Sequence, residues 1–201
     1  PSGSLSEFVH DFDISRLGDV LVVSARIYTT PDFADETTDS TLVDYNKFAV
    51  LVYRRSGNHF SLHQEITSDN IGDGFGKSVA VSNDGEILAI GEPYSDDKLV
   101  NQGKVYVYTL DDGKFVYTQT LNSASGEEAE LFGYNLSFDQ NQLAVTSRQG
   151  DIVNEITFDD NTTLFDHNTT RFLQTNFNVG QVHLYERIND ALVYADVFES
   201  R

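Results

Sequence analysis

The sequence contains no cysteine, no methionine and no tryptophan, and only 3 of its 201 residues are proline. Without cysteine the chain has no thiol nucleophile, no iron–sulfur cluster and no cysteine-ligated zinc site. The compartment stays open, because an extracellular domain with a large core needs no disulfides. The scarcity of proline and the lack of low-complexity tracts disfavour a disordered linker.

Two kinds of apolar pattern are also missing. No run approaches the roughly 18–20 apolar residues that cross a bilayer as a helix. No segment keeps the 3.6-residue periodicity of an amphipathic helix, so we expect helices to be rare or absent. The 14 Phe and 10 Tyr suit packed strands instead, and 201 residues suffice for one sizeable all-β domain.

Positive charge is scarce. Lys and Arg number 13 against 32 Asp and Glu, which gives a formal net charge of −19. Such a surface repels the phosphates of nucleic acids and of anionic lipids, so neither is an expected partner. Two interpretations of the charge stay open: a role in divalent-cation binding or salty surroundings, and plain solubility.

A pattern of four strands recurs three times along the chain. The clearest copy starts at Phe75 with FGKSVAVS and continues with EILAIGEP, GKVYVYTL and KFVYTQTL. Another begins with FGYNLSFD at Phe132, and a less regular one begins with FVHDFDIS at Phe8. Anchor residues keep the register, with Tyr53, Tyr108 and Tyr185 closing the third strand and Phe60, Phe115 and Leu192 opening the fourth. A repeat of this size with four strands is typical of a β-propeller blade.

We therefore predict an all-β fold of three four-stranded antiparallel sheets, arranged as propeller blades. The predicted blades span residues 8–66, 67–121 and 122–201 and follow an N-terminal extension of residues 1–7. Three blades do not close a ring, so the end blades would expose apolar faces. We expect the missing blades from the rest of a longer polypeptide, with another copy or another protein as alternatives. The opening PSGSLS has no initiator Met and no signal peptide, as expected for a removed leader or a piece of a longer chain.

The connection between the second and third strands varies most in length. It runs from Arg26 to Lys47 in the first copy, from Pro93 to Gln102 in the second and over residues 149–179 in the third. In a propeller these connections emerge on one rim, and insertions in repeat proteins often mark the binding face. We predict a partner-binding rim whose candidate residues are Asp35, Asp39, Asp96, Asp97, Asp159 and Asp160.

The middle copy resembles a known family. Its FG at Phe75–Gly76, its LAIGEP at Leu88–Pro93 and its GKVYVY at Gly103–Tyr108 are similar to the FG-GAP repeat. The third copy keeps FG at Phe132–Gly133 but has TSR in place of the GAP-like element, and the first has Phe8–Val9 and SAR. The resemblance implies an integrin α-like propeller, usually of seven blades, that is extracellular or surface-exposed and binds partners without chemistry.

The same resemblance implies a calcium-binding DxDxDG loop between the first and second strands of many blades. The corresponding segments Ser15–Gly18, Ser82–Gly85 and Asp139–Gln142 are too short, and none offers three carboxylates. We predict tight hairpin turns there, with Asp84–Gly85 as a type I′ pair, and we expect no inherited calcium site and no other cofactor. Adventitious Ca²⁺ binding by the acidic loops stays an alternative to plain solvated carboxylates.

Catalytic motifs are incomplete. GDGFGKS at Gly72–Ser78 looks like a phosphate-binding loop, but Ile71 stands where its first glycine is required and the segment leads into a predicted strand. The five histidines form no HxH or HExxH pair, and no GxSxG elbow is present. We therefore expect no enzyme activity.

Three N-x-S/T sequons occur, at Asn135, Asn161 and Asn168. Asn135 falls in a predicted inner strand, where a glycan would not fit. Asn161 and Asn168 lie in the longest connection and are the candidate glycosylation sites in a eukaryotic host.

Two function classes remain open. The first is a non-catalytic module for protein or glycan recognition or adhesion at a cell or particle surface. The second is a structural building block of a large extracellular or virion assembly, such as a filament, capsid, appendage or cell-wall layer. Variable polar loops favour recognition, and open apolar blade faces favour assembly.

Overall fold

The computed structural model describes residues 6–28, 46–68, 73–96, 99–123, 128–148, 152–155, 173–176 and 180–199. All regular elements in these ranges are β-strands. Within the same ranges, no helix is long and apolar enough to span a bilayer. The predicted all-β fold is confirmed.

Three four-stranded antiparallel sheets make up the body of the chain, and their strands follow one another in sequence. Blade 1 consists of β1 (Ser6–Ile14), β2 (Val20–Tyr28), β3 (Asn46–Ser56) and β4 (His59–Thr67). Blade 2 consists of β5 (Ser78–Val81), β6 (Ile87–Glu92), β7 (Lys104–Asp111) and β8 (Lys114–Leu121). Blade 3 consists of β9 (Leu136–Asp139), β10 (Gln142–Arg148), β13 (Gly180–Ile188) and β14 (Ala191–Glu199). These sheets are the three predicted blades.

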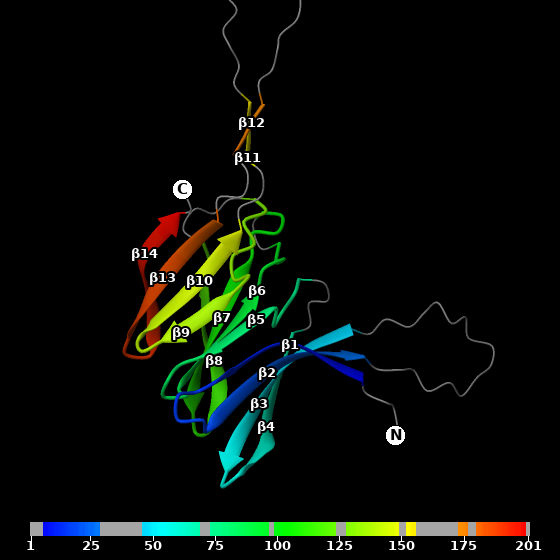
Figure 1. Ribbon diagram of the computed structural model, residues 1–201, viewed down its shortest axis with the longest axis vertical. Helices are drawn as coiled ribbons and strands as arrows, with labels where there is room; N and C mark the ends of the chain where they lie inside the picture. The colour runs from blue at the N-terminus through cyan, green and yellow to red at the C-terminus, as the bar shows by residue number, and fades with distance from the viewer. Residues whose placement is uncertain are drawn as a thin grey trace, which may run out of the picture.

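A two-stranded ladder interrupts blade 3 between its second and third strands. It pairs β11 (Ile152–Glu155) with β12 (Leu173–Asn176) in antiparallel fashion. The ladder lies inside the long connection that the sequence predicts over residues 149–179, and its two strands were not predicted. It projects away from the body of the blade (Figure 1).

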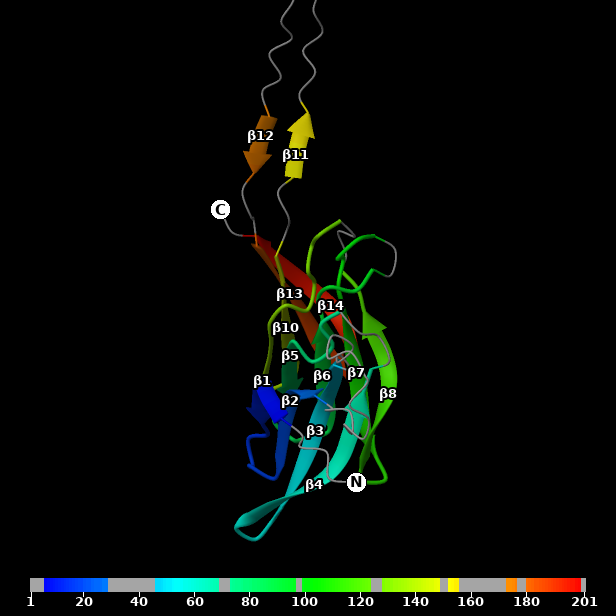
Figure 2. The same cartoon turned by 90° about the vertical axis from the view of Figure 1, so that its right-hand side faces the viewer.

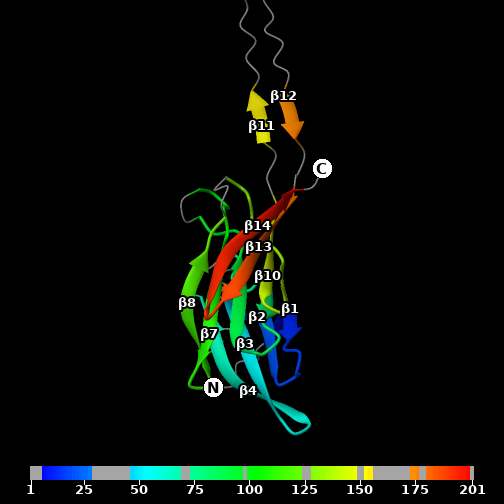
Figure 3. The same ribbon diagram turned by 90° about the vertical axis from the view of Figure 1, so that its left-hand side faces the viewer.

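The three sheets stack face to face, with blade 2 between the other two (Figure 1). Strands β5, β6, β7 and β8 follow one another across the molecule in Figure 2, so the first strands lie on one side and the last on the other. Figure 3 shows the opposite side, with β13 and β14 of blade 3 in front. This is the radial arrangement of propeller blades.

An apolar core fills each of the two junctions between blades. Between blades 1 and 2 it includes Val50, Val52, Val79, Leu88 and Phe115. Between blades 2 and 3 it includes Ala89, Val107, Phe132, Leu143 and Leu192. Each sheet therefore buries a face only by packing on its neighbour, as expected for a repeat unit with a single sheet.

The anchor tyrosines mark a shared irregularity of the three blades. The register between the third and fourth strands shifts directly before Tyr53, Tyr108 and Tyr185, as at a β-bulge. The third strands continue for three further residues beyond each tyrosine. Our prediction that these tyrosines close the third strand is therefore wrong, although they do occupy equivalent positions.

The glycines of the FG-GAP-like elements have a packing reason. Gly91, in the LAIGEP segment of blade 2, lies against Gly133, in the FG element of blade 3, and a Cβ at Gly91 would collide with the carbonyl oxygen of Gly133. Gly133 also has a φ of 88°, which favours glycine. Ser78 donates a hydrogen bond of 2.8 Å to the same carbonyl. The glycines thus let the backbones of two neighbouring blades come into direct contact.

Candidate functional site

The predicted rim is described best at the β6–β7 connection of blade 2. The side chain of Asp96 is exposed, and its Oδ1 accepts a hydrogen bond of 2.7 Å from the backbone N–H of Asn101. The same connection accepts hydrogen bonds from the segment before blade 3, because Ala129 donates to Val100 and Leu131 donates to Asn101. Asp96 therefore helps to order a loop that is tied to the next blade.

The other predicted site residues lie outside the described residues. Asp97 falls in the short gap of the β6–β7 connection, and the remaining candidates fall in the longer gaps: Asp35, Asp39, Asp159, Asp160, Asn161 and Asn168. Their roles remain predictions. Asn135 does lie among the described residues, directly before β9, and it is exposed rather than enclosed in a strand.

A buried carboxylate stands where β6 reaches the rim. Glu92 has no exposed surface, and its Oε2 accepts a hydrogen bond of 2.9 Å from the Tyr106 hydroxyl and lies 3.3 Å from Lys104 Nζ. Ser68, at the end of blade 1, reaches Glu92 Oε1 at 3.5 Å. Burial raises the pKa of Glu92, although the hydrogen bond from Tyr106 and the charge of Lys104 oppose that shift.

A second buried carboxylate occupies the next junction between blades. Glu130 has no exposed surface and accepts a hydrogen bond from Ser123 of blade 2. His183 Nε2 of blade 3 lies 3.6 Å from Glu130 Oε1 and 3.2 Å from the Ser147 hydroxyl. By strand pairing, His183 corresponds to Tyr106 of the first junction. Ser123 follows Leu121 by two residues, as Ser68 follows Ile66, so the two serines are also equivalent.

These two carboxylates act between blades. Neither side chain is exposed, and their partners come from two successive blades. Among the described residues, no group of three or more His, Cys, Asp or Glu side chains is placed to hold a metal ion. The arrangement therefore joins neighbouring blades through buried polar contacts.

The hairpin turn between the first and second strands of blade 2 is held by hydrogen bonds within the turn and by hydrogen bonds from blade 3. In blade 2, Gly85 donates to the carbonyl of Ser82 at 2.8 Å, and only Gly85 of the Asp84–Gly85 pair has a positive φ. A type I′ turn needs a positive φ at both positions, so that prediction is wrong. Arg187 of blade 3 donates to Asp84 at 2.6 Å and to Glu86 at 2.7 Å.

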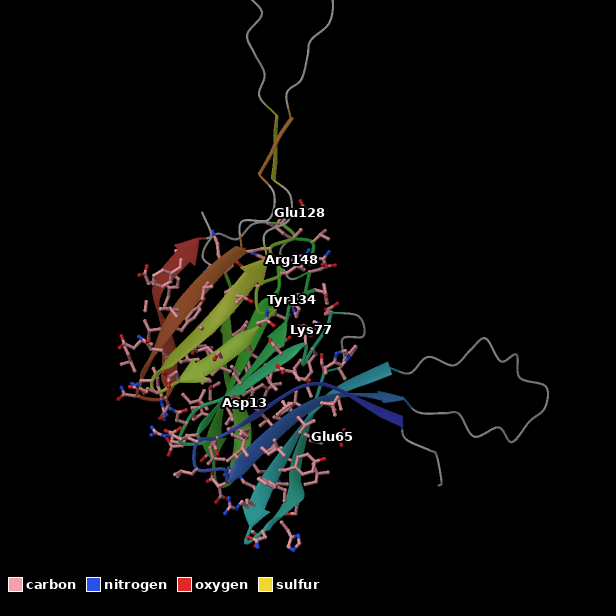
Figure 4. All side chains as sticks on the ribbon, in the orientation of Figure 1. Asp13, Glu65, Lys77, Glu128, Tyr134 and Arg148 are labelled. Carbon is pink, nitrogen blue, oxygen red and sulfur yellow. The ribbon has the colours of Figure 1, made fainter. Side chains whose placement is uncertain are left out.

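Two carboxylates of blade 1 accept hydrogen bonds from the edge of β5 that pairs with no other described strand. The Oδ2 atoms of Asp11 and Asp13 accept hydrogen bonds of 2.9 and 2.8 Å from the backbone N–H groups of Val79 and Val81. Asp13 lies between the first two blades in Figure 4. Burial raises the pKa of Asp13 despite these hydrogen bonds. Just before the first strands of blades 2 and 3, Lys77 Nζ lies 5.4 Å from the ring centre of Tyr134, and Figure 4 labels both.

Two glutamines clamp the outer strands. Gln64 of β4 donates to the carbonyl of Phe115 and accepts from its N–H, both at 2.8 Å. Gln119 of β8 makes the same pair of bonds with Leu192, at 2.9 and 3.1 Å. Neither these glutamines nor the buried glutamates were predicted from the sequence. Gln64 and Gln119 could have been found as equal residues at equal positions of the repeat.

The fold defines a set of three β-propeller blades, and comparison with known proteins agrees with it. The model of the FG-GAP repeat matches residues 67–108, which confirms the resemblance of blade 2 to that family. The chain is 32% identical to mouse integrin alpha-11 over 89 residues, and 30% identical to human integrin alpha-11 over 93 residues. These alignments cover 42% and 44% of the chain but only 8% of each integrin.

One solved structure aligns with almost the whole chain. It is a crystal structure of a protein assigned as a 6-phosphogluconolactonase of Bacteroides uniformis, and the alignment covers 97% of this chain and 58% of that one. The sequence identity is 11% and the TM-score 0.46.

Proposed function

We propose that the chain is a non-catalytic β-propeller module that recognises a protein or glycan partner at a cell or particle surface. The observation that carries the proposal is the similarity of the central blade to the FG-GAP repeat and to integrin alpha-11, a cell-surface receptor subunit. The partner meets the rim formed by the connections between second and third strands, and no cofactor takes part.

The described residues support a recognition role over a catalytic one. The titratable groups gathered near the rim, Glu92 and Glu130, are buried and joined to neighbouring blades. The exposed carboxylate of Asp96 belongs to a loop held by its own hydrogen bonds, which presents a fixed surface to a partner. Preorganised loops on a rigid scaffold are the usual place for binding residues.

The test is binding of the purified chain to an array of glycans and to a panel of purified cell-surface and secreted proteins. Partners that bind are measured again with Asp159→Lys/Asp160→Lys on the rim. The matched control is Asp111→Lys/Asp112→Lys in the β7–β8 hairpin, at the opposite end of blade 2. We expect the rim variant to lose at least about tenfold in affinity and the control to stay within about twofold. Equal affinities of both variants, or no binding on either array, would contradict the proposal.

A further inference from the structure

The two junctions between blades are built from equivalent residues. In each junction the blade that comes earlier in the chain presents two apolar residues to the later blade. Blade 1 presents Val50 and Ile66, and blade 2 presents Val105 and Leu121. Each pair lies side by side on the third and fourth strands of its blade. All four side chains are buried, with Ile66 at 8% and Leu121 at 4% exposure. We call this the presenting face of a blade.

Blade 3 has a presenting face of the same kind. Val182 pairs with Phe198 as Val50 pairs with Ile66, and Leu184 lies on the same face. Yet Phe198 is 55% exposed, whereas its counterparts in the other blades are buried. Within the described part of the chain, no fourth blade covers this face.

Blade 1 has the complementary face. In blade 2 the side chains that receive the preceding blade include Val79, Val81 and Phe115, all at most 3% exposed. Their counterparts in blade 1, by strand pairing, are Phe12, Ile14 and Phe60, at 66%, 47% and 39% exposure. We call this the receiving face of blade 1.

The charges of the two free faces also match. Arg187 of blade 3 donates from Nε to the carbonyl of Asn189 in its own hairpin, and its terminal nitrogens bind carboxylates of the preceding blade. Arg55 of blade 1 holds the equivalent position, with Nε donating to Gly57 O at 2.9 Å, and it is exposed. Blade 3 offers the exposed carboxylate of Asp139 at its first hairpin, the same place from which Asp84 and Glu86 of blade 2 bind Arg187. Arg55 of the receiving face thus has a carboxylate of opposite charge, Asp139, at the matching place of the presenting face.

We propose that a second copy of this chain occupies the receiving face of blade 1 with the presenting face of its blade 3. The contact is heterologous, because two different faces meet. Two copies joined head to tail at both ends would bring six blades together, within the usual range of roughly four to eight blades for a closed propeller. Association buries the exposed phenylalanines of both faces and sets Arg55 near Asp139 of blade 3.

One position on the presenting face of blade 3 differs from the equivalent position in blades 1 and 2, and it provides a further variant for the experiment. Asp196 stands where blades 1 and 2 carry Gln64 and Gln119, the side chains that clamp the next blade. An aspartate accepts a hydrogen bond from a backbone N–H, but it cannot donate to the neighbouring carbonyl. Asp196→Gln should therefore strengthen the contact between copies, with a dissociation constant about three- to tenfold lower.

The experiment measures the mass of the full chain by sedimentation over a range of concentrations, with two variants that each break one face. Phe60→Asp spoils only the receiving face and Phe198→Asp only the presenting face. Each variant alone retains one intact face but lacks its complement, so we expect 22.5 kDa, the mass of one chain. The mixture should give a 1:1 complex of about 45 kDa, twice 22.5 kDa. Val100→Asp, at an exposed valine of the β6–β7 connection, is the control and should associate like the parent.

The wild type should exceed the mass of one chain, and Asp196→Gln should do so at lower concentration. A wild type that keeps its strand signal in circular dichroism but stays at 22.5 kDa at every concentration overturns the proposal. So does a mixture of the two variants that forms no complex. The first result would leave both faces to blades of a longer polypeptide or of another protein. The rim variants of the recognition test leave both faces intact, so failure of one proposal is separable from failure of the other.

Discussion

At the scale of the residue, polar side chains at repeated positions join one blade to the next. Gln119 satisfies both backbone groups of Leu192, a residue that is 1% exposed. Gln119→Ala should destabilise the chain by about 1–3 kcal/mol, because a buried N–H and C=O lose their partner. Chemical denaturation followed by circular dichroism measures the loss. The control Gln142→Ala, at an exposed glutamine of β10, should cost less than about 0.5 kcal/mol; equal losses would refute the clamp.

The contact of Asp84 with Arg187 predicts a dependence of stability on pH. Burial alone would raise the pKa of Asp84, but hydrogen bonds from Ser82 and Arg187 outweigh it and lower the pKa below its usual 3.8. Since the folded-state pKa is the lower one, Asp84 stabilises the folded chain above its usual pKa, and this contribution fades as the pH falls through the folded-state value.

The measurement compares wild type with Asp84→Asn from neutral to acid pH. At pH 7 the wild type should be more stable by about 0.5–1 kcal/mol, and the two should converge near about pH 2. Salt at about 1 M should narrow the neutral-pH difference, because the pair is partly exposed. A difference that keeps its size across the whole pH range would be inconsistent with this role of Asp84.

At the scale of the element, the approach of one blade to the next depends on glycine. A methyl group at Gly91 would strike the carbonyl oxygen of Gly133, so Gly91→Ala should lower stability by about 2–3 kcal/mol. Gly113, in the β7–β8 hairpin, has a φ of 82°, and a Cβ added there would meet no atom within 4 Å. Gly113→Ala should cost only about 1 kcal/mol, from backbone strain. Thermal unfolding of both variants measures the contrast, and a Gly91 variant as stable as the Gly113 variant would speak against close packing.

The strands themselves could be predicted because alternating apolar residues define them. The three copies placed Val79–Val81, Val105–Tyr108 and Val182–Tyr185 in strands, as observed. The β-bulge before each tyrosine could not be predicted, since it depends on how the outer strand twists against its neighbour. The type of the Ser82–Gly85 turn could not be predicted from the sequence either, because Asp-Gly fits several turn types in which glycine has a positive φ.

The functional side chains were less predictable than the strands. Glu92 lies in the LAIGEP segment, and a glutamate that follows an apolar run is typical of the solvent-exposed end of a strand. Its burial follows from Lys104 and Tyr106 beside it and Ser68 from the preceding blade. Such contacts between blades depend on the stacking of sheets, which a single sequence does not specify at the level of side chains.

At the scale of the whole molecule, we predict that the blades fold without calcium. In blade 2 the connection between the first and second strands, where the resemblance to the FG-GAP family implies the ion, has only the five residues 82–86, and its Asp84 accepts hydrogen bonds from Ser82 and Arg187. Addition of about 1 mM Ca²⁺ or of a chelator should shift the thermal midpoint by less than about 1 °C, because only a bound ligand stabilises. Mg²⁺ at equal concentration is the control. A midpoint that rises steadily with Ca²⁺ and not with Mg²⁺ would show a specific site.

The central claim is that this chain recognises a partner through its loop rim. Hydrogen–deuterium exchange of the full chain, with and without a partner found on the arrays, tests it most directly. We predict that the partner slows exchange in peptides covering residues 29–45, 93–102 and 149–179, and leaves the β7–β8 and β13–β14 hairpins at the opposite end unchanged. Protection confined to those hairpins, with unchanged exchange in the three rim peptides, would contradict the account.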